Sequence, residues 1–147
     1  MIYLVDDDVG RLAAIRFAFA EQGLELHQFT DASEAYAALT GRPLETTDCI
    51  LVDLMLPAGR EHRLFPEAQT EGYRWTGKLL VEKLLEKDRL KFEKRIAILT
   101  STRQIIPTTQ AWADSEEIRI FRKRMNPYEL VAQIEVLIRG LNNTDQR

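Results

Sequence analysis

The sequence has 147 residues, of which 45% are apolar and 29% are charged, and this length suits one α/β core rather than two ordinary domains. Its net charge of −3 argues against a nucleic-acid-binding protein, because such domains are normally basic. No apolar stretch is long enough to cross a bilayer and no signal-peptide pattern opens the chain, so we expect a cytoplasmic protein without a membrane partner.

Short apolar runs alternate with segments of helical periodicity, a pattern that predicts βαβ units and a parallel sheet. Five strands are expected, at 2–5, 24–29, 49–52, 96–99 and 118–121. The third run is continuously apolar, as in a central strand that is covered on both faces. It contains the single cysteine, Cys49, which reads as a buried apolar side chain and cannot form an intrachain disulfide.

A helix is expected after each strand. Asp8 is interpreted as the cap of the first helix, and Asp31 with Glu34 as the capping box of the second. Pro107 begins the fourth helix, and Asn126 can cap the fifth.

One domain, residues 1–141, therefore accounts for the pattern, followed by a polar tail at 142–147 that we expect to be disordered. Within it, residues 58–76 form a long irregular insertion after the third strand.

Chemically useful side chains follow four of the predicted strands. Asp6 and Asp7 follow the first strand, Asp53 the third, Thr100 the fourth and Lys123 the fifth. Taken singly, each would be an ordinary turn, strand end or surface lysine. Ligands of an open parallel sheet bind beyond the carboxyl ends of its strands, so these residues should share a site. Carboxylates on neighbouring strand ends repel one another unless a cation lies between them, and Mg²⁺ prefers such oxygen ligands.

The motifs at these strand ends resemble the receiver domains of bacterial two-component response regulators, the CheY-like superfamily. They are Leu-Val-Asp-Asp-Asp at 4–8, Leu-Val-Asp-Leu-Met-Leu-Pro at 51–57, Ile-Leu-Thr-Ser at 98–101, and Lys123. The resemblance covers nearly the whole chain. It implies a flavodoxin-like, doubly wound five-stranded parallel sheet of order 2-1-3-4-5 with five helices.

The resemblance also implies a role for each site residue. Asp53 would accept a phosphoryl group, while Lys123 and Thr100 would contact phosphoryl oxygens. The implied Mg²⁺ ligands are Asp6, Asp7, Asp53 and the backbone carbonyl of Met55. An aspartate carboxylate is a competent nucleophile for this chemistry, and cations carry most of the catalysis of phosphoryl transfer.

The sequence departs from the family pattern in three places. Arg124 replaces the usual proline after the lysine, so the cis peptide that the family often has there is not expected. Ile120 stands where the family has a switch aromatic, and Phe121 should point to the opposite face of its strand. The glycine that typically opens the third helix of the family is Gly77 here, and the connection from Asp53 to it far exceeds the roughly 2–6 residues of an ordinary βα loop.

Three functions are compatible with these residues. The leading hypothesis is a stand-alone receiver in a phosphorelay, which takes its phosphoryl group from a histidine kinase or a histidine phosphotransfer protein and signals by binding an unknown downstream protein. Whether it forms a homodimer is left open. The alternative is a receiver-like interaction module that works without phosphorylation. A phosphatase with its nucleophile at Asp6 is disfavoured, since it would leave Asp53 without a role.

The insertion at 58–76 has two interpretations. Its large apolar side chains are Leu64, Phe65, Tyr73 and Trp75, and its basic ones are Arg60, His62, Arg63 and Arg74. It could fold against its own domain with its aromatic residues buried. It could instead be a docking surface or gate whose basic residues sense the charge at Asp53, since long loops in compact domains are more often functional than idle.

Overall fold

The computed structural model describes residues 1–10 and 12–144. Within them lies one five-stranded parallel sheet of order β2-β1-β3-β4-β5, which confirms the predicted flavodoxin-like topology. The strands are β1 (Ile2–Val5), β2 (Leu26–Phe29), β3 (Cys49–Val52), β4 (Ile96–Thr100) and β5 (Arg119–Arg122). The first and third strands have the predicted bounds, and the others differ by one or two residues at their ends.

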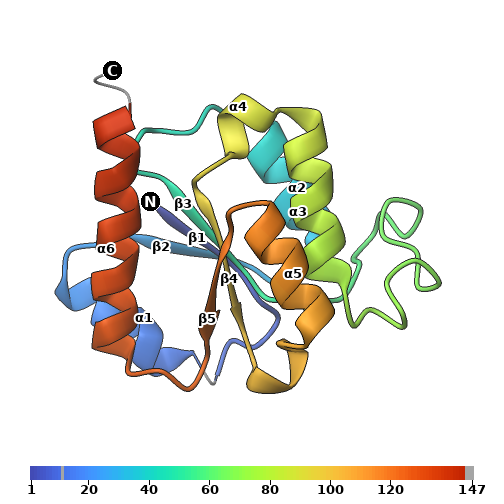
Figure 1. Ribbon diagram of the computed structural model, residues 1–147, viewed down its shortest axis with the longest axis horizontal. Coiled ribbons are helices and arrows are strands. Elements are labelled where there is room, and N and C mark those ends of the chain that lie inside the picture. Colours follow the sequence, from blue (N-terminus) through green and yellow to red (C-terminus); the bar gives the residue numbers. More distant parts are fainter. Residues whose placement is uncertain (11, 145–147) are drawn as a thin grey trace.

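Two helices cover one face of the sheet and four cover the other (Figure 1). They are α1 (Ala13–Glu21), α2 (Ala32–Thr40), α3 (Thr76–Lys87), α4 (Arg89–Phe92), α5 (Pro107–Ser115) and α6 (Pro127–Thr144). Helices α1 and α6 form the two-helix layer, and a short 3₁₀ turn, Thr102–Gln104, precedes α5. No helix in the described part of the chain is both long enough and apolar enough to cross a membrane.

The sixth helix, the single turn α4, was not expected from the sequence. Asp88 follows the end of α3 and is also the N-cap of α4. Its carboxylate accepts a 3.1 Å hydrogen bond from the Lys91 backbone N–H. The Lys91 ammonium then donates to the carbonyls of Leu39 and Arg42, at 2.8 and 2.6 Å, where α2 has ended. The turn thus satisfies carbonyl groups left free at the end of another helix.

The central strand β3 is buried on both sides, as predicted. Ile50 and Val52 belong to the core on the side of α2 to α5, whereas Cys49 and Leu51 belong to the core on the side of α1 and α6. The alternation of side chains along a strand explains this division. Because both faces are covered, the residue that ends this strand, Asp53, lies at the middle of the sheet's carboxyl edge.

The predicted caps of the second and last helices are confirmed. Asp31 accepts a 2.8 Å hydrogen bond from the Glu34 N–H, and Asn126 accepts one of 2.9 Å from the Tyr128 N–H. The predicted end of the last helix is too early, because α6 continues past Leu141 to Thr144. Residues 145–147 of the expected tail lie outside the described residues.

The interpretation of Asp8 as a helix cap is wrong. The N-cap of α1 is Leu12, and it makes no side-chain capping hydrogen bond. Asp8 lies instead in the turn after β1, where its N–H donates 2.9 Å to the Asp6 carboxylate. The side chain of Gln28 on β2 donates to the Asp6 and Asp8 carbonyls of this turn, and α1 begins only at Ala13.

The insertion packs against its own domain. Phe65 is completely buried. Its ring lies edge-on to that of Tyr36 in α2, with the two ring centroids 6.4 Å apart. Leu64, Tyr73 and Trp75 are partly buried against the same core. At its start, the Ser33 hydroxyl donates to the Ala58 carbonyl and accepts a 3.0 Å hydrogen bond from the Glu61 N–H. The apolar residues that the sequence singled out are therefore its anchors.

Candidate functional site

Backbone hydrogen bonds extend the sheet pairing just beyond the strands and place the predicted residues at one edge. The Asp53 N–H donates 2.9 Å to the Val5 carbonyl, and the Lys123 N–H donates 3.0 Å to the Thr100 carbonyl. Parallel strands end at the same edge, so the carboxyl ends of β1, β3, β4 and β5 bring their following residues together. The site therefore depends on chain segments that are distant in sequence.

Each carboxylate oxygen of Asp53 accepts one hydrogen bond from a side chain of another strand end. The Thr100 hydroxyl donates 2.8 Å to Oδ1, and the Lys123 ammonium donates 2.8 Å to Oδ2. Asp53 is 5% exposed and Thr100 is fully buried. The carboxylate is thus held in a fixed orientation at the bottom of the site.

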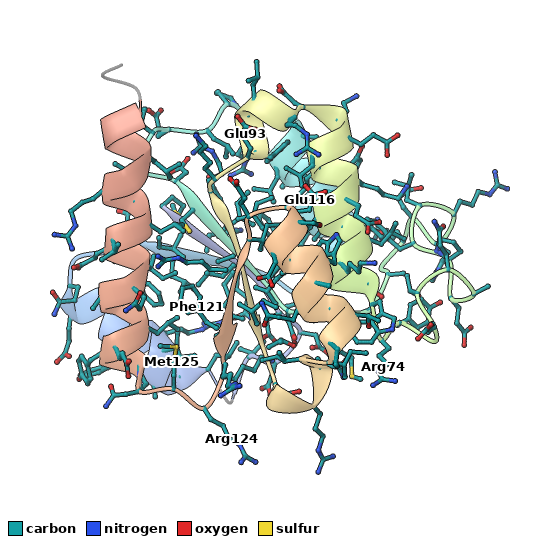
Figure 2. The ribbon with its side chains drawn as sticks, viewed as in Figure 1. Arg74, Glu93, Glu116, Phe121, Arg124 and Met125 are labelled. Atoms are coloured by element: carbon teal, nitrogen blue, oxygen red, sulfur yellow. The ribbon has the colours of Figure 1, made fainter. Side chains whose placement is uncertain are left out.

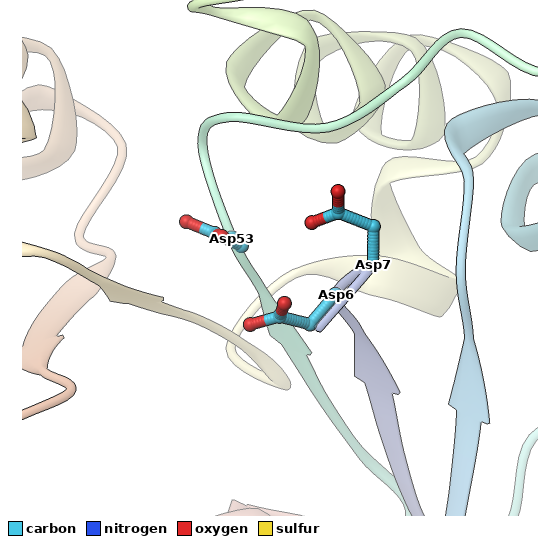
Figure 3. A group of neighbouring side chains, drawn as sticks. All are labelled: Asp6, Asp7 and Asp53. Atoms are coloured by element: carbon cyan, nitrogen blue, oxygen red, sulfur yellow. The ribbon is translucent and has the colours of Figure 1, made fainter. Parts of the chain in front are cut away.

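Asp6, Asp7 and Asp53 form an acidic cluster (Figure 3). One carboxylate oxygen from each lies within 4.8 Å of the others; Asp6 and Asp53 are buried and Asp7 is exposed. The Lys123 ammonium, 2.8 Å from Asp6 Oδ2 as well as from Asp53 Oδ2, bridges the two buried carboxylates. One lysine therefore offsets the charge of two buried acids.

The ionisation of the buried groups reflects their burial and their mutual contacts. Burial, reinforced by the neighbouring Asp53 charge, raises the pKa of Asp6 to about 6 despite its contact with Lys123. Burial alone would lower the pKa of Lys123, but its contacts with the Asp53 and Asp6 carboxylates outweigh that effect and raise the pKa above its ordinary value. Lys123 stays charged, and a further cation would be favourable beside Asp6.

A Mg²⁺ ion fits these residues. Asp6 Oδ2 is buried, and among the described residues it has an ion pair but no hydrogen bond of acceptable geometry. The cluster offers oxygen ligands alone, as hard divalent cations require. Met55 lies in the turn just after Asp53, and its side chain is half exposed.

Gly77 lies in the first turn of α3, against the site, one residue after the start of the helix that it was predicted to open. Its N–H donates 2.9 Å to the Leu54 carbonyl, and a β-carbon added to it would lie 1.8 Å from the carbonyl oxygen of Asp53. Only glycine permits the helix to approach the strand end this closely. The insertion thus leaves the strand after Asp53 and returns to the same residue.

The departures near β5 appear as expected. Phe121 is buried in the core on the side of α1 and α6, whereas Ile120 is partly buried on the opposite face. The described residues contain no cis peptide bond, so the Lys123–Arg124 bond is trans. Arg124 points away from the domain, while Phe121 and Met125 lie beside α6 (Figure 2).

Two residues near the site were missed by the sequence reasoning. Gln28, on β2, donates to the backbone carbonyls of Asp6 and Asp8. Gln104, in the 3₁₀ turn after β4, is buried and accepts a 3.4 Å hydrogen bond from Arg74 of the insertion. The available signal for Gln28 was its polar side chain at a position that continues the apolar alternation of Leu24 and Leu26. Nothing in the sequence connects Gln104 with Arg74.

The basic residues of the insertion are not arranged around the Asp53 carboxylate, whose hydrogen-bond partners among the described residues are Thr100 and Lys123. Arg74 instead stacks on Trp75, 4.9 Å from its ring centroid, and reaches Gln104. Figure 2 shows Arg74 beside the start of α5. The insertion therefore touches the segment that follows Thr100, rather than the carboxylate itself.

Comparison with solved structures identifies the fold. No protein-family model matches the sequence, and no curated protein matches it. The chain is nonetheless similar in structure to a CheY-like response regulator receiver domain from Methanospirillum hungatei JF-1, with a TM-score of 0.71 and 17% identity, covering 97% of this chain and 96% of that one.

Two further receiver domains give the same result. The signal receiver domain of a putative LuxO repressor protein from Vibrio parahaemolyticus has a TM-score of 0.70 and 11% identity, over 99% of this chain and 94% of that one. The receiver domain of the Francisella response regulator 1452 has a TM-score of 0.67 and 18% identity, over 95% and 96%. The chain thus has the fold of CheY-like receiver domains.

Proposed function

We propose that this chain is a phosphoacceptor receiver in which Asp53 takes up a phosphoryl group. The observation that supports this most strongly is the pair of 2.8 Å hydrogen bonds from Thr100 and Lys123 to the two oxygens of one buried carboxylate. Three separate strand ends converge there, and the receiver fold carries the same arrangement of elements. A buried aspartate held only for stability would not need a lysine and an acidic neighbour pair as well.

The proposed step is a transfer from nitrogen to oxygen. An Asp53 carboxylate oxygen attacks the phosphorus of a phosphorylated histidine, forming an O–P bond. The N–P bond breaks, and its electron pair stays on the imidazole nitrogen, which takes up a proton. Lys123 already contacts Asp53 and can move to pair with a phosphoryl oxygen, while the Thr100 hydroxyl can donate to another.

A bound Mg²⁺ would neutralise charge that develops on the phosphoryl oxygens. Asp6, Asp7 and Asp53 would hold it, with the backbone carbonyl of Met55 completing the protein ligands. Without the ion, the negative charge of the three carboxylates exceeds the positive charge of Lys123, and the pKa of Asp6 is raised to about 6. Neutralising that charge gives the ion a direct energetic reason to bind.

The partners follow from the same chemistry. The donor would be a histidine kinase or a histidine phosphotransfer protein, and the output would be contact with a downstream protein. A module that binds its partner without phosphorylation is the second candidate. The Ile120 and Arg124 departures favour it, since they weaken the usual link between the site and the surface of β5.

Incubation with a small phosphodonor and Mg²⁺, followed by intact-mass analysis, tests the proposal. We expect one added phosphoryl group that is stable in acid and labile in base. It should not be added when Mg²⁺ is chelated. Asp53→Asn should abolish it. Asp48→Asn is the matched control, because Asp48 is also buried but pairs with the N-terminal amine, 3.1 Å away, outside the site.

Equal modification of Asp53→Asn and the parent chain would refute the site assignment. No modification of the parent by any phosphodonor, with Mg²⁺ binding intact, would favour the phosphorylation-independent module. Asp7→Asn separates metal binding from the nucleophile: it should weaken Mg²⁺ binding in a calorimetric titration, since Asp7 is the exposed acid of the cluster.

A further inference from the structure

The turn that carries the two metal-binding acids is held from the neighbouring strand by Gln28. Its side-chain amide nitrogen donates 2.6 Å to the Asp6 carbonyl and lies 3.4 Å from the Asp8 carbonyl. These two carbonyls bracket Asp7 along the chain. We propose that Gln28 is a positioning residue, which fixes the backbone of this turn so that the Asp7 carboxylate faces Asp6 and Asp53. This inference rests on the proposed function.

The Asp7 side chain needs such support. Among the residues that the structure describes, its carboxylate makes no hydrogen bond or ion pair, and it is exposed to solvent. Its place in the cluster, within 4.8 Å of the other two acids, therefore depends on the path of its backbone. That path is fixed on one side by the Asp6 N–H, which donates 2.9 Å to the Phe29 carbonyl, and on the other by Gln28.

The strand pairing places Gln28 where it can do this. Gln28 is in register with Leu4 of β1, so its side chain leaves β2 just before the turn begins. Leu26, two residues earlier on β2, packs into the core beneath α1 and α6. Alternation along the strand puts Gln28 on the same face, where an apolar side chain would otherwise be expected.

The orientation of the amide also follows from its surroundings. Both groups that face its nitrogen are carbonyl acceptors, so reversing the amide would set oxygen against oxygen. In the observed orientation Oε1 is buried and has no hydrogen-bond partner among the described residues. An unsatisfied buried acceptor is unfavourable, so a glutamine at this position weakens the core unless its donors serve another purpose.

Replacing Gln28 by methionine removes both donors while keeping the length and removing no charge. We expect this variant to bind Mg²⁺ about tenfold more weakly in a calorimetric titration, as typically follows loss of a group that orients metal ligands. Leu26→Ala is the control, because it removes packing from the same strand and face without touching the turn. It should lower the melting temperature and leave Mg²⁺ affinity unchanged.

Gln28→Asn serves as a second variant if the methionine variant does not fold, because its shorter side chain cannot reach both carbonyls. Mg²⁺ affinity of the folded Gln28 variant within about threefold of the parent, well short of the effect expected for an orienting group, would overturn the inference. A parent chain that binds no Mg²⁺ would instead refute the metal site itself. The two failures are distinguished because the second appears without any mutation.

Discussion

Gly77 and Asp53 are in such close contact that a β-carbon on the glycine would lie 1.8 Å from the aspartate's carbonyl oxygen. The start of α3 thereby packs directly against the backbone of the proposed nucleophile. Any side chain at position 77 must displace either the helix or the end of β3. The contact between Gly77 and Asp53 therefore holds the two ends of the insertion close together beside the site.

Gly77→Ala should consequently destabilise the protein and disturb the site. We expect a loss of about 1–3 kcal/mol in the free energy of unfolding, as for an overpacked core, measured by urea denaturation. Phosphorylation of Asp53 should fall as well. Gly140→Ala is the control, since among the described residues no atom outside its own helix backbone and chain neighbours lies within 4 Å of its added β-carbon, and removing a helix glycine there should stabilise by about 0.5–1 kcal/mol. Equal effects of both substitutions would contradict this account.

Asp6→Asn should stabilise the metal-free protein at neutral and alkaline pH. The pKa of Asp6 is raised to about 6 by burial, so the folded state holds its proton more tightly than the unfolded chain, whose aspartates titrate near 3.9. The stability that this proton contributes is complete below about pH 4 and is lost as the pH rises through 6.

The gain from Asp6→Asn should thus be about 1–3 kcal/mol at pH 8 and vanish near pH 4, in urea unfolding with a chelator present. Asp7→Asn, which removes an exposed carboxylate of the same cluster, should give a smaller gain because water screens the charge. A stabilisation by Asp6→Asn that is constant across this pH range would show that the carboxylate is not strained in the folded protein.

Thr100→Val should lower stability through its hydrogen bond to Asp53. The hydroxyl is completely buried and donates 2.8 Å to a carboxylate oxygen, so its loss should cost about 1.5–3 kcal/mol. In an Asp53→Ala background the same substitution should cost much less, and the difference measures the coupling. Thr109→Val, at a buried threonine of α5, should cost the same in both backgrounds.

Hydrogen exchange with and without a phosphoryl mimic should distinguish the two interpretations of the insertion. Residues near Ala58 are tied to Ser33 of α2 and should not change. Residues near Arg74 should change, because Arg74 bonds to Gln104 just beyond Thr100. Arg74→Met should abolish that change. If protection across 58–76 stays constant while β4, α5 and β5 respond, the insertion has a structural role alone.

The strands and the site residues could be predicted because their signals are local. The apolar run at 49–52 and its abrupt end at Asp53 are visible in consecutive residues, and parallel strands always end at one edge of their sheet. Asp6, Asp7, Thr100 and Lys123 could be grouped for the same reason. The capping boxes at Asp31 and Asn126 are local as well, so they too were recognised.

The role of Asp8, the turn α4 and the contact of Arg74 with Gln104 depend instead on groups that meet only after folding. Asp8 resembles a helix cap in sequence, but it lies in a separate turn, where its N–H donates to the Asp6 carboxylate and its carbonyl accepts from Gln28. The raised pKa of Asp6 likewise requires burial beside Asp53. Burial and long-range pairing are properties of the packed chain, so they were decided by the tertiary structure, whereas the sequence alone determined which strand ends carry the acids, the hydroxyl and the lysine.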